Sequence, residues 1–308
     1  MRRRDFLGKT AKTAVVAGAA YSFIGVDKVW GTGTYSAPSA YDLIAVKGGE
    51  PDVMFDLAMN AMGGMAKFVK KNQTVVIKPN IGWDRTPERA ANTNPLLIKK
   101  IVEQCLAVGA KDVFVFDHTA DTWTKCYKTS GIEKYVKEAG GKMVPGNTEN
   151  YYQEISIPGG KKLKTTKIHE LILESDVYIN VPVLKHHSST KLSITMKNLM
   201  GSVWDRRYWH KNDLHQCIAD FASYQRKPDL NIVDGYNVIM KNGPQGVSKS
   251  DVLNMKVQLV STDMVAIDAA AAKMYGSEPA SVPHIRMANE MNLGIMDLSK
   301  LSIKRIKV

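Results

Sequence analysis

The chain has 308 residues, of which 44% are hydrophobic and 23% charged, as in a folded globular protein large enough for a substantial α/β core. Its net charge of +12 favours anionic partners. The lysines are scattered, and no helix-turn-helix, zinc-finger or RNA-recognition pattern accompanies them, so we expect no nucleic acid partner. Three cysteines without a CxxC pair argue against a zinc ribbon, a disulfide framework and a cysteine-ligated iron–sulfur cluster.

The first 39 residues have the organisation of an export signal. The sequence "RRDFL" at positions 3–7 resembles the twin-arginine motif, and an apolar segment follows at 13–26. That segment is short and rich in Ala and Gly, which disfavours a membrane span. We therefore expect export machinery to recognise residues 1–39, which are then removed, and residues 40–308 to act in the periplasm or another extracytoplasmic space. An N-terminal anchor is the alternative.

Residues 40–308 alternate apolar runs with amphipathic segments. Helical patterns cover 54–71, 94–108, 213–225 and 263–275. The runs with the length and β-branched content of buried strands are "YDLIAVKG", "QTVVIKPN", "KDVFVFDH", "SDVYINVPVLK", "LNIVDGY" and "MKVQLVST". This alternation predicts a single α/β domain: a mainly parallel sheet with helices on both faces. Residues 151–168 do not follow this alternation of strand and helix patterns, and their sequence predicts a small antiparallel edge hairpin.

Polar or ionisable groups follow five of these apolar runs. Ligands of open parallel sheets bind beyond the carboxyl ends of the strands, so we expect the groups to share one cleft. The expected catalytic residues are Lys78, Asp117, Lys185, His186, His187 and Asp234. The residues expected to bind the ligand or a cofactor are Asn80, Lys197, Asn198 and Gly243. A dense polar and aromatic loop at 205–210 is of the kind that often covers sites, although an exposed basic tip is the alternative.

A divalent transition metal is one interpretation of this cleft. Imidazole and carboxylate groups suit zinc, iron or nickel, and the candidate ligands are His118, His186, His187 and His215. Adjacent histidines on an extended chain project to opposite sides, however, so His186 and His187 are poorly placed to bind one ion. The sequence also contains no HExxH motif.

Proton chemistry on a small anion is the second interpretation. Lys78, Lys185 and Lys197 would hold a carboxylate or phosphate while a histidine moves a proton near neutral pH. A lysine shielded from water could instead form a Schiff base. The third interpretation is structural: the lysines and histidines lie on a solvated rim, and Asp117 and Asp234 accept hydrogen bonds from turn amides.

Several segments also carry a resemblance to a known family. They include "IKPNIGWDRTPERAANTNPLLIKKIVEQCLAVGAKDVFVFDH", "INVPVLKHHSSTKLSITMKNLMG", "IVDGYNVIMKNGPQG" and "STDMVAIDAAAAKMYG". In this order they resemble the family catalogued as domain of unknown function 362, over residues 41–303. Many members of that family carry ferredoxin-type four-cysteine motifs. This chain lacks them, so the resemblance implies no iron–sulfur cluster here.

The resemblance implies a set of shared positions rather than an established activity. They are Lys78, Pro79, Asn80, Thr93, Asn94, Asp117, His118, Lys185, His186, His187, Lys197, Asn198, His215, Asp234, Gly243, Pro244 and Asp263. Our first hypothesis is an exported enzyme acting on a small anionic substrate, by proton transfer or with a metal. The alternatives are a non-catalytic protein that binds an anion or metal, and a redox protein with a cofactor other than a cysteine-ligated cluster.

Overall fold

The computed structural model describes residues 41–308, so the expected signal segment and its cleavage lie outside the described residues. Within 41–308, helices of the length and apolar character that a membrane span requires do not occur. The sheet strands of this part are β1 (Leu43–Lys47), β2 (Thr74–Pro79), β3 (Asp112–Val115), β4 (Lys142–Met143), β7 (Val177–Val181), β8 (Val183–His187), β9 (Lys191–Ser193), β10 (Leu230–Ile239), β11 (Val252–Ser261) and β12 (Ile303–Lys307).

These strands form one twisted, mostly parallel sheet. Its main order is β12-β1-β11-β10-β7-β2-β3-β4, and β10, β7, β2, β3 and β4 are mutually parallel. β11 runs antiparallel to both of its neighbours. All six predicted strand segments are confirmed, but Pro182 divides the longest of them into β7 and β8. Proline donates no hydrogen bond to a ladder; beyond it, β8 pairs with β10 and β9 instead of continuing beside β2.

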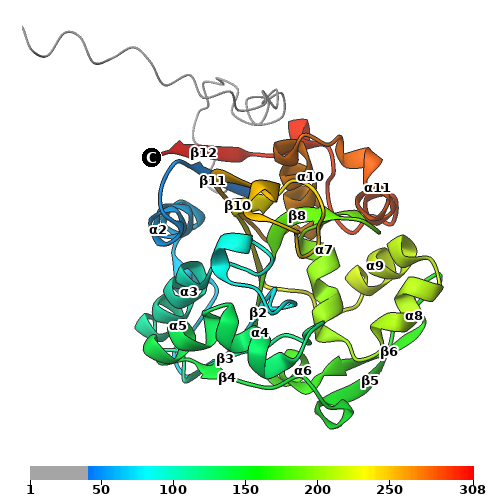
Figure 1. Cartoon of the computed structure of the whole chain (residues 1–308), viewed down its shortest axis with the longest axis horizontal. Coiled ribbons are helices and arrows are strands. Elements are labelled where there is room, and N and C mark those ends of the chain that lie inside the picture. Colours follow the sequence, from blue (N-terminus) through cyan, green and yellow to red (C-terminus); the bar gives the residue numbers. More distant parts are fainter. Residues whose placement is uncertain (1–40) are drawn as a thin grey trace, which may run out of the picture.

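Helices cover both faces of the sheet, as predicted (Figure 1). Alternate residues of each strand point to opposite faces; thus Val75 and Ile77 pack in one apolar core and Val76 in the other. The first core is covered by α2 (Pro51–Met62), α3 (Pro95–Ala107), α4 (Trp123–Thr129) and α5 (Ile132–Glu138). The second is covered by α7 (Thr195–Asn198), α9 (Leu214–Ala222), α10 (Met264–Tyr275) and α11 (Pro283–Glu290).

Local capping chemistry explains where these helices begin and end. Asn94 accepts a hydrogen bond from Leu96 N and begins α3, and Asp263 accepts from Val265 N and begins α10. The predicted helix over 54–71 is too long, because α2 ends at Met62. Gly63 follows in the left-handed conformation, with φ 102°, which glycine adopts without steric cost and which terminates a helix.

The predicted hairpin forms, but it is not the edge of the main sheet. β5 (Tyr152–Ser156) and β6 (Thr165–His169) pair only with each other in a separate antiparallel sheet. Ile155 and Ile168 pack into the same core as α9, which holds the hairpin against that face of the protein instead of beside β4. Figure 1 shows this hairpin next to α8 (Arg206–Lys211), and α6 (Glu170–Glu174) follows it in the chain.

Candidate functional site

A cavity of about 380 Å³ lies beyond the carboxyl ends of β2 and β3, next to β8. We call it the strand-end cavity. Its polar lining includes Asn80, Asp117, Lys185, His187 and Asn198. Two more cations line it, Lys197 from α7 and Arg206 from α8. The sheet places these groups together because parallel strands deliver their carboxyl ends to one edge.

A buried ion pair adjoins the cavity: Asp117 lines it, whereas Lys78, which the sequence placed among the catalytic residues, lies behind Asp117 and does not line it. Lys78 Nζ lies 2.7 Å from Asp117 Oδ1, and 0% and 2% of the two side chains are exposed. Lys78 also donates to the carbonyl oxygen of Pro79 and to Asn198 Oδ1, while Asp117 Oδ2 accepts from Ile81 N. Burial lowers the pKa of Lys78, and the charge of Asp117 opposes that effect. Every strong donor and acceptor of the pair therefore has a partner within the protein.

Gly201 makes room for this pair. A Cβ at this position would overlap Asp117 Oδ1 and come within 2.5 Å of Lys78 Nζ. The carbonyl oxygen of Gly201 also accepts a hydrogen bond from His118 N at 2.9 Å, which ties the segment after α7 to the end of β3. Here glycine is needed because it has no side chain.

Lys185 also lines the cavity, and its side chain is almost completely buried, with 2% exposed. Its Nζ donates to Asn80 Oδ1 at 2.7 Å and to the carbonyl oxygen of Ala91. None of the carboxylates in residues 41–308 forms an ion pair with it. Burial, together with the nearby charge of Lys197, lowers the pKa of Lys185 to about 7. Near neutral pH this amine exchanges readily between its charged and neutral forms.

Two further cations come from α7, which contains Lys197, and from the first residue of α8, Arg206. Lys197 Nζ lies 3.2 Å from Met200 Sδ, and burial followed by the charge of Arg206 lowers the pKa of Lys197 to about 8. Arg206 begins α8, whose N-cap is Asp205, and it donates to the carbonyl oxygens of His118 at 2.8 Å and Thr119 at 2.7 Å. These two bonds fix the guanidinium at the cavity wall.

The cavity region therefore carries more positive than negative charge. Lys185, Lys197 and Arg206 line it together with Asp117, the carboxylate of the lining, which is already paired with Lys78. His187 adds no charge near neutral pH, because burial and the neighbouring lysines hold its pKa far below the usual range. Desolvated cations without counter-ions are energetically costly, and an anion bound in the cavity would lower that cost.

The two adjacent histidines have different environments. His187 lines the cavity, whereas His186 Nδ1 accepts a hydrogen bond from Gly243 N at 3.1 Å. Gly243 itself contacts His186 so closely that a Cβ would overlap the His186 carbonyl oxygen. His186 and Gly243 thus hold the loop that presents Pro244 to the cavity, and neither of them lines it.

Asp234 does not line the cavity either, in contrast to the catalytic position expected from the sequence. Its two carboxylate oxygens accept hydrogen bonds from Asn94 N at 2.7 Å and Tyr236 N at 3.0 Å. Burial raises its pKa to about 6. The structure places Asp234 as a support for the beginning of α3, which agrees with the structural interpretation of this residue.

The histidines named as metal ligands do not assemble. His118 stacks on Trp204, and His215 Nδ1 lies 3.1 Å from His284 Nδ1, between α9 and α11. Within residues 41–308, groups of three His, Cys, Asp or Glu side chains that could hold a metal ion are absent. The geometry gives the sequence-based metal set no support.

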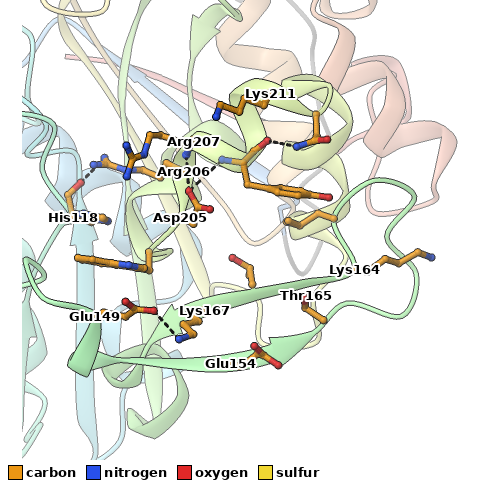
Figure 2. A pocket seen from close by; sticks show the side chains of 15 residues that line it. His118, Glu149, Glu154, Lys164, Thr165, Lys167, Asp205, Arg206, Arg207 and Lys211 are labelled. Carbon is orange, nitrogen blue, oxygen red and sulfur yellow. Dashed lines mark hydrogen bonds and ion pairs between the residues drawn. The ribbon is translucent and has the colours of Figure 1, made fainter.

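A second, larger depression of about 1060 Å³ lies between the β5–β6 hairpin and α8 (Figure 2). We call it the hairpin groove. Its charged lining is mostly exposed, and Lys167 pairs with Glu149 at 2.7 Å. Trp204 and His118 stack along it with ring centroids 5.0 Å apart. His118 and Arg206 belong to both depressions, so the groove adjoins the strand-end cavity.

Sequence reasoning did not identify Arg206 as a site residue. It indicated only that the loop at 205–210 is of the kind that often covers sites, and the dense run of charged and aromatic residues was the available signal. His210, which also lines the cavity, comes from the same segment.

Comparison with known proteins identifies relatives. The chain is 26% identical over 256 residues to a thylakoid-associated protein of Synechocystis sp., covering 77% of this chain and 73% of that one. Two solved structures are similar in part: the lactate racemase apoprotein of Thermoanaerobacterium thermosaccharolyticum (14% identity, TM-score 0.44) and a Thermotoga maritima protein (11%, 0.45). The matches cover 72% and 79% of this chain but 55% and 60% of those chains, less than two thirds of either. A family model matches residues 75–273, and the chain belongs to the family described as Domain of unknown function (DUF362).

Proposed function

We propose that the strand-end cavity is an enzyme site for a small anion, a carboxylate or a phosphate, in which Lys185 transfers a proton. One observation carries this proposal: three buried or partly buried cations, Lys185, Lys197 and Arg206, line the cavity with a single carboxylate, Asp117, which is already paired with the buried Lys78. An anionic group between Lys197 and Arg206 would supply the missing negative charge. Arginine and lysine together are well suited to oxyanions, because their N–H groups all donate.

The environment of Lys185 supports the proton-transfer part. A group transfers protons most effectively when its pKa lies near the working pH, and burial lowers the pKa of Lys185 to about 7. Asn80 Oδ1 and the Ala91 carbonyl oxygen fix the position of the amine. His187 is the weaker candidate, because its pKa is held far below the neutral range and it does not become protonated there.

Calorimetric titration of the protein with oxalate and with inorganic phosphate tests the binding part. We expect both anions to bind at pH 7, and we expect Lys197→Met to lower the affinity by about tenfold or more, equivalent to about 1.4 kcal/mol. Lys211→Met is the matched control, because it removes an exposed lysine of the hairpin groove by the same chemical change. Absence of binding, or equal effects of the two variants, contradicts the proposal.

Deuterium exchange tests the catalytic part. Carboxylates that bind are incubated with the protein in D2O, and loss of the carbon-bound proton signals of the carboxylate is followed by NMR. We expect Lys185→Arg, which retains the positive charge, to slow this exchange about 100-fold, within the usual range for a lost general base. Binding without exchange in the unaltered protein indicates the second candidate.

That second candidate is a non-catalytic protein that captures a small anion. It is favoured by the engagement of Asp117 with Lys78 and Ile81 N, which leaves the cavity without an unpaired carboxylate to act as a base. Under this alternative Lys185 contributes charge alone, and Lys185→Arg retains the full function.

A further inference from the structure

We infer that Lys185 is a covalent catalytic residue, whose amine forms a Schiff base with the carbonyl carbon of a small 2-oxo acid in the strand-end cavity. This inference rests on the proposed function, because the carboxylate of such a substrate occupies the same anion site. It adds the substrate class and the bond that forms.

The hydrogen bonds of Lys185 suit a nucleophile. A neutral amine has two N–H groups and one lone pair, and Asn80 Oδ1 and the Ala91 carbonyl oxygen are two acceptors for the N–H groups. The lone pair is then left for an electrophile. Since Lys185 belongs to the cavity lining, the electrophile within its reach is a group held in the cavity.

The surroundings also keep this amine partly neutral at neutral pH. Burial and the positive charge of Lys197 lower the pKa of Lys185 to about 7, whereas an exposed lysine is almost entirely protonated there. A desolvated lysine beside a second cation is a known way to activate an amine for attack on carbonyl compounds.

The other lysines of the region fit the role less well. Lys78 is bound to Asp117, Asn198 Oδ1 and the Pro79 carbonyl oxygen, so its ammonium form is stabilised. Lys197 has the Met200 sulfur at 3.2 Å, and its pKa of about 8 leaves most of it protonated at pH 7. These properties suit Lys197 as the cation that binds the carboxylate and as an acid.

The step is balanced without an external oxidant or reductant. The Lys185 lone pair attacks the carbonyl carbon, the carbon–oxygen π pair moves to oxygen, and one proton moves from nitrogen to oxygen to give a carbinolamine. Lys197 then donates a proton to the hydroxyl group, which leaves as water while the nitrogen lone pair forms the C=N bond. Addition of water reverses the sequence and restores both lysines.

Reductive trapping tests this assignment. The protein is incubated at pH 7 with glyoxylate or pyruvate and sodium cyanoborohydride, and modified lysines are quantified by peptide mass spectrometry. We expect Lys185 to be alkylated at least about tenfold faster than Lys134, whose side chain is 70% exposed. The rate should rise with pH through about 7, since the neutral amine is the reactive form. Lys185→Arg should abolish the fast reaction and leave the slow surface reaction.

The controls separate this inference from the proposed function. Lys197→Met should slow trapping, Lys211→Met should not, and oxalate should protect Lys185 in the unaltered protein, a readout that needs no variant to fold. Oxalate and phosphate can bind as expected while Lys185 reacts no faster than Lys134 with either oxo acid. That result contradicts the Schiff base at Lys185 and leaves the proposal of anion binding in the cavity supported. If neither anion binds and Lys185 is not trapped, both proposals fall.

Discussion

The strand-end cavity and the hairpin groove adjoin each other, yet they differ in what their charges can do. The groove is the larger, at about 1060 Å³ against about 380 Å³, but its lysines and carboxylates are mostly exposed to water. Water screens such charges and weakens their interactions with a ligand. In the smaller cavity Lys185 and Asp117 are almost completely buried. Desolvation of the charged groups, rather than the size of the depression, therefore marks the cavity as the chemical site.

The two regions contain the same type of ion pair at the same distance, which allows a direct comparison. Lys78–Asp117 and Lys167–Glu149 are both 2.7 Å apart, but the side chains are 0% and 2% exposed in the first pair and 42% and 50% in the second. We expect Asp117→Asn to lower the free energy of unfolding by about 3–5 kcal/mol, because it leaves the Lys78 charge buried and unpaired. Glu149→Gln should change it by less than about 1 kcal/mol. Urea unfolding followed by circular dichroism measures both.

A double variant sharpens this comparison. Lys78→Met combined with Asp117→Leu removes both charges, and we expect it to recover much of the stability lost in Asp117→Asn, since apolar side chains of similar volume can replace a buried pair. Equal losses in Asp117→Asn and Glu149→Gln would show that burial does not distinguish the two pairs.

Gly201 provides a smaller perturbation of the same pair. We expect Gly201→Ala to cost about 1–3 kcal/mol, because the added Cβ overlaps Asp117 Oδ1 and displaces the ion pair. Gly82→Ala is the matched control: Gly82 also lines the cavity, and its Cβ would lie 3.8 Å from the nearest atom, Asn80 Nδ2. Urea unfolding of the two alanine variants measures the difference. Similar stabilities would contradict the assigned role of Gly201.

Sequence reasoning located the strand ends well because their pattern is local. An apolar run followed by an ionisable residue placed Lys78, Asp117 and Lys185 at one edge of a parallel sheet, and the structure brings these three together. The topology rule for open α/β sheets is sufficient for that step.

The remaining assignments depend on contacts between distant segments. Asp234 binds Asn94 N, 140 residues away, and Arg206 binds the His118 carbonyl oxygen, 88 residues away. Neither contact leaves a periodic signal in the sequence. The choice of His187 over His186 as the cavity residue follows from the pairing of β8 with β9 and from the contact of His186 with Gly243 N.

The pH dependence of anion binding gives the smallest expected effect. Lys185 and Lys197 have pKa values of about 7 and about 8, so both are charged below pH 6.5 and lose their charge as the pH rises. We expect oxalate affinity to be nearly constant from pH 5.5 to 6.5 and to fall by about tenfold by pH 8.5. Bound oxalate favours the charged amines and raises their pKa values, so binding at pH 7.5 should take up as much as about one proton. Titration calorimetry in buffers of different ionisation enthalpy measures this uptake. An affinity that is unchanged between pH 6.5 and 8.5 would assign the binding charge to exposed lysines, such as those of the hairpin groove, instead of Lys185 and Lys197.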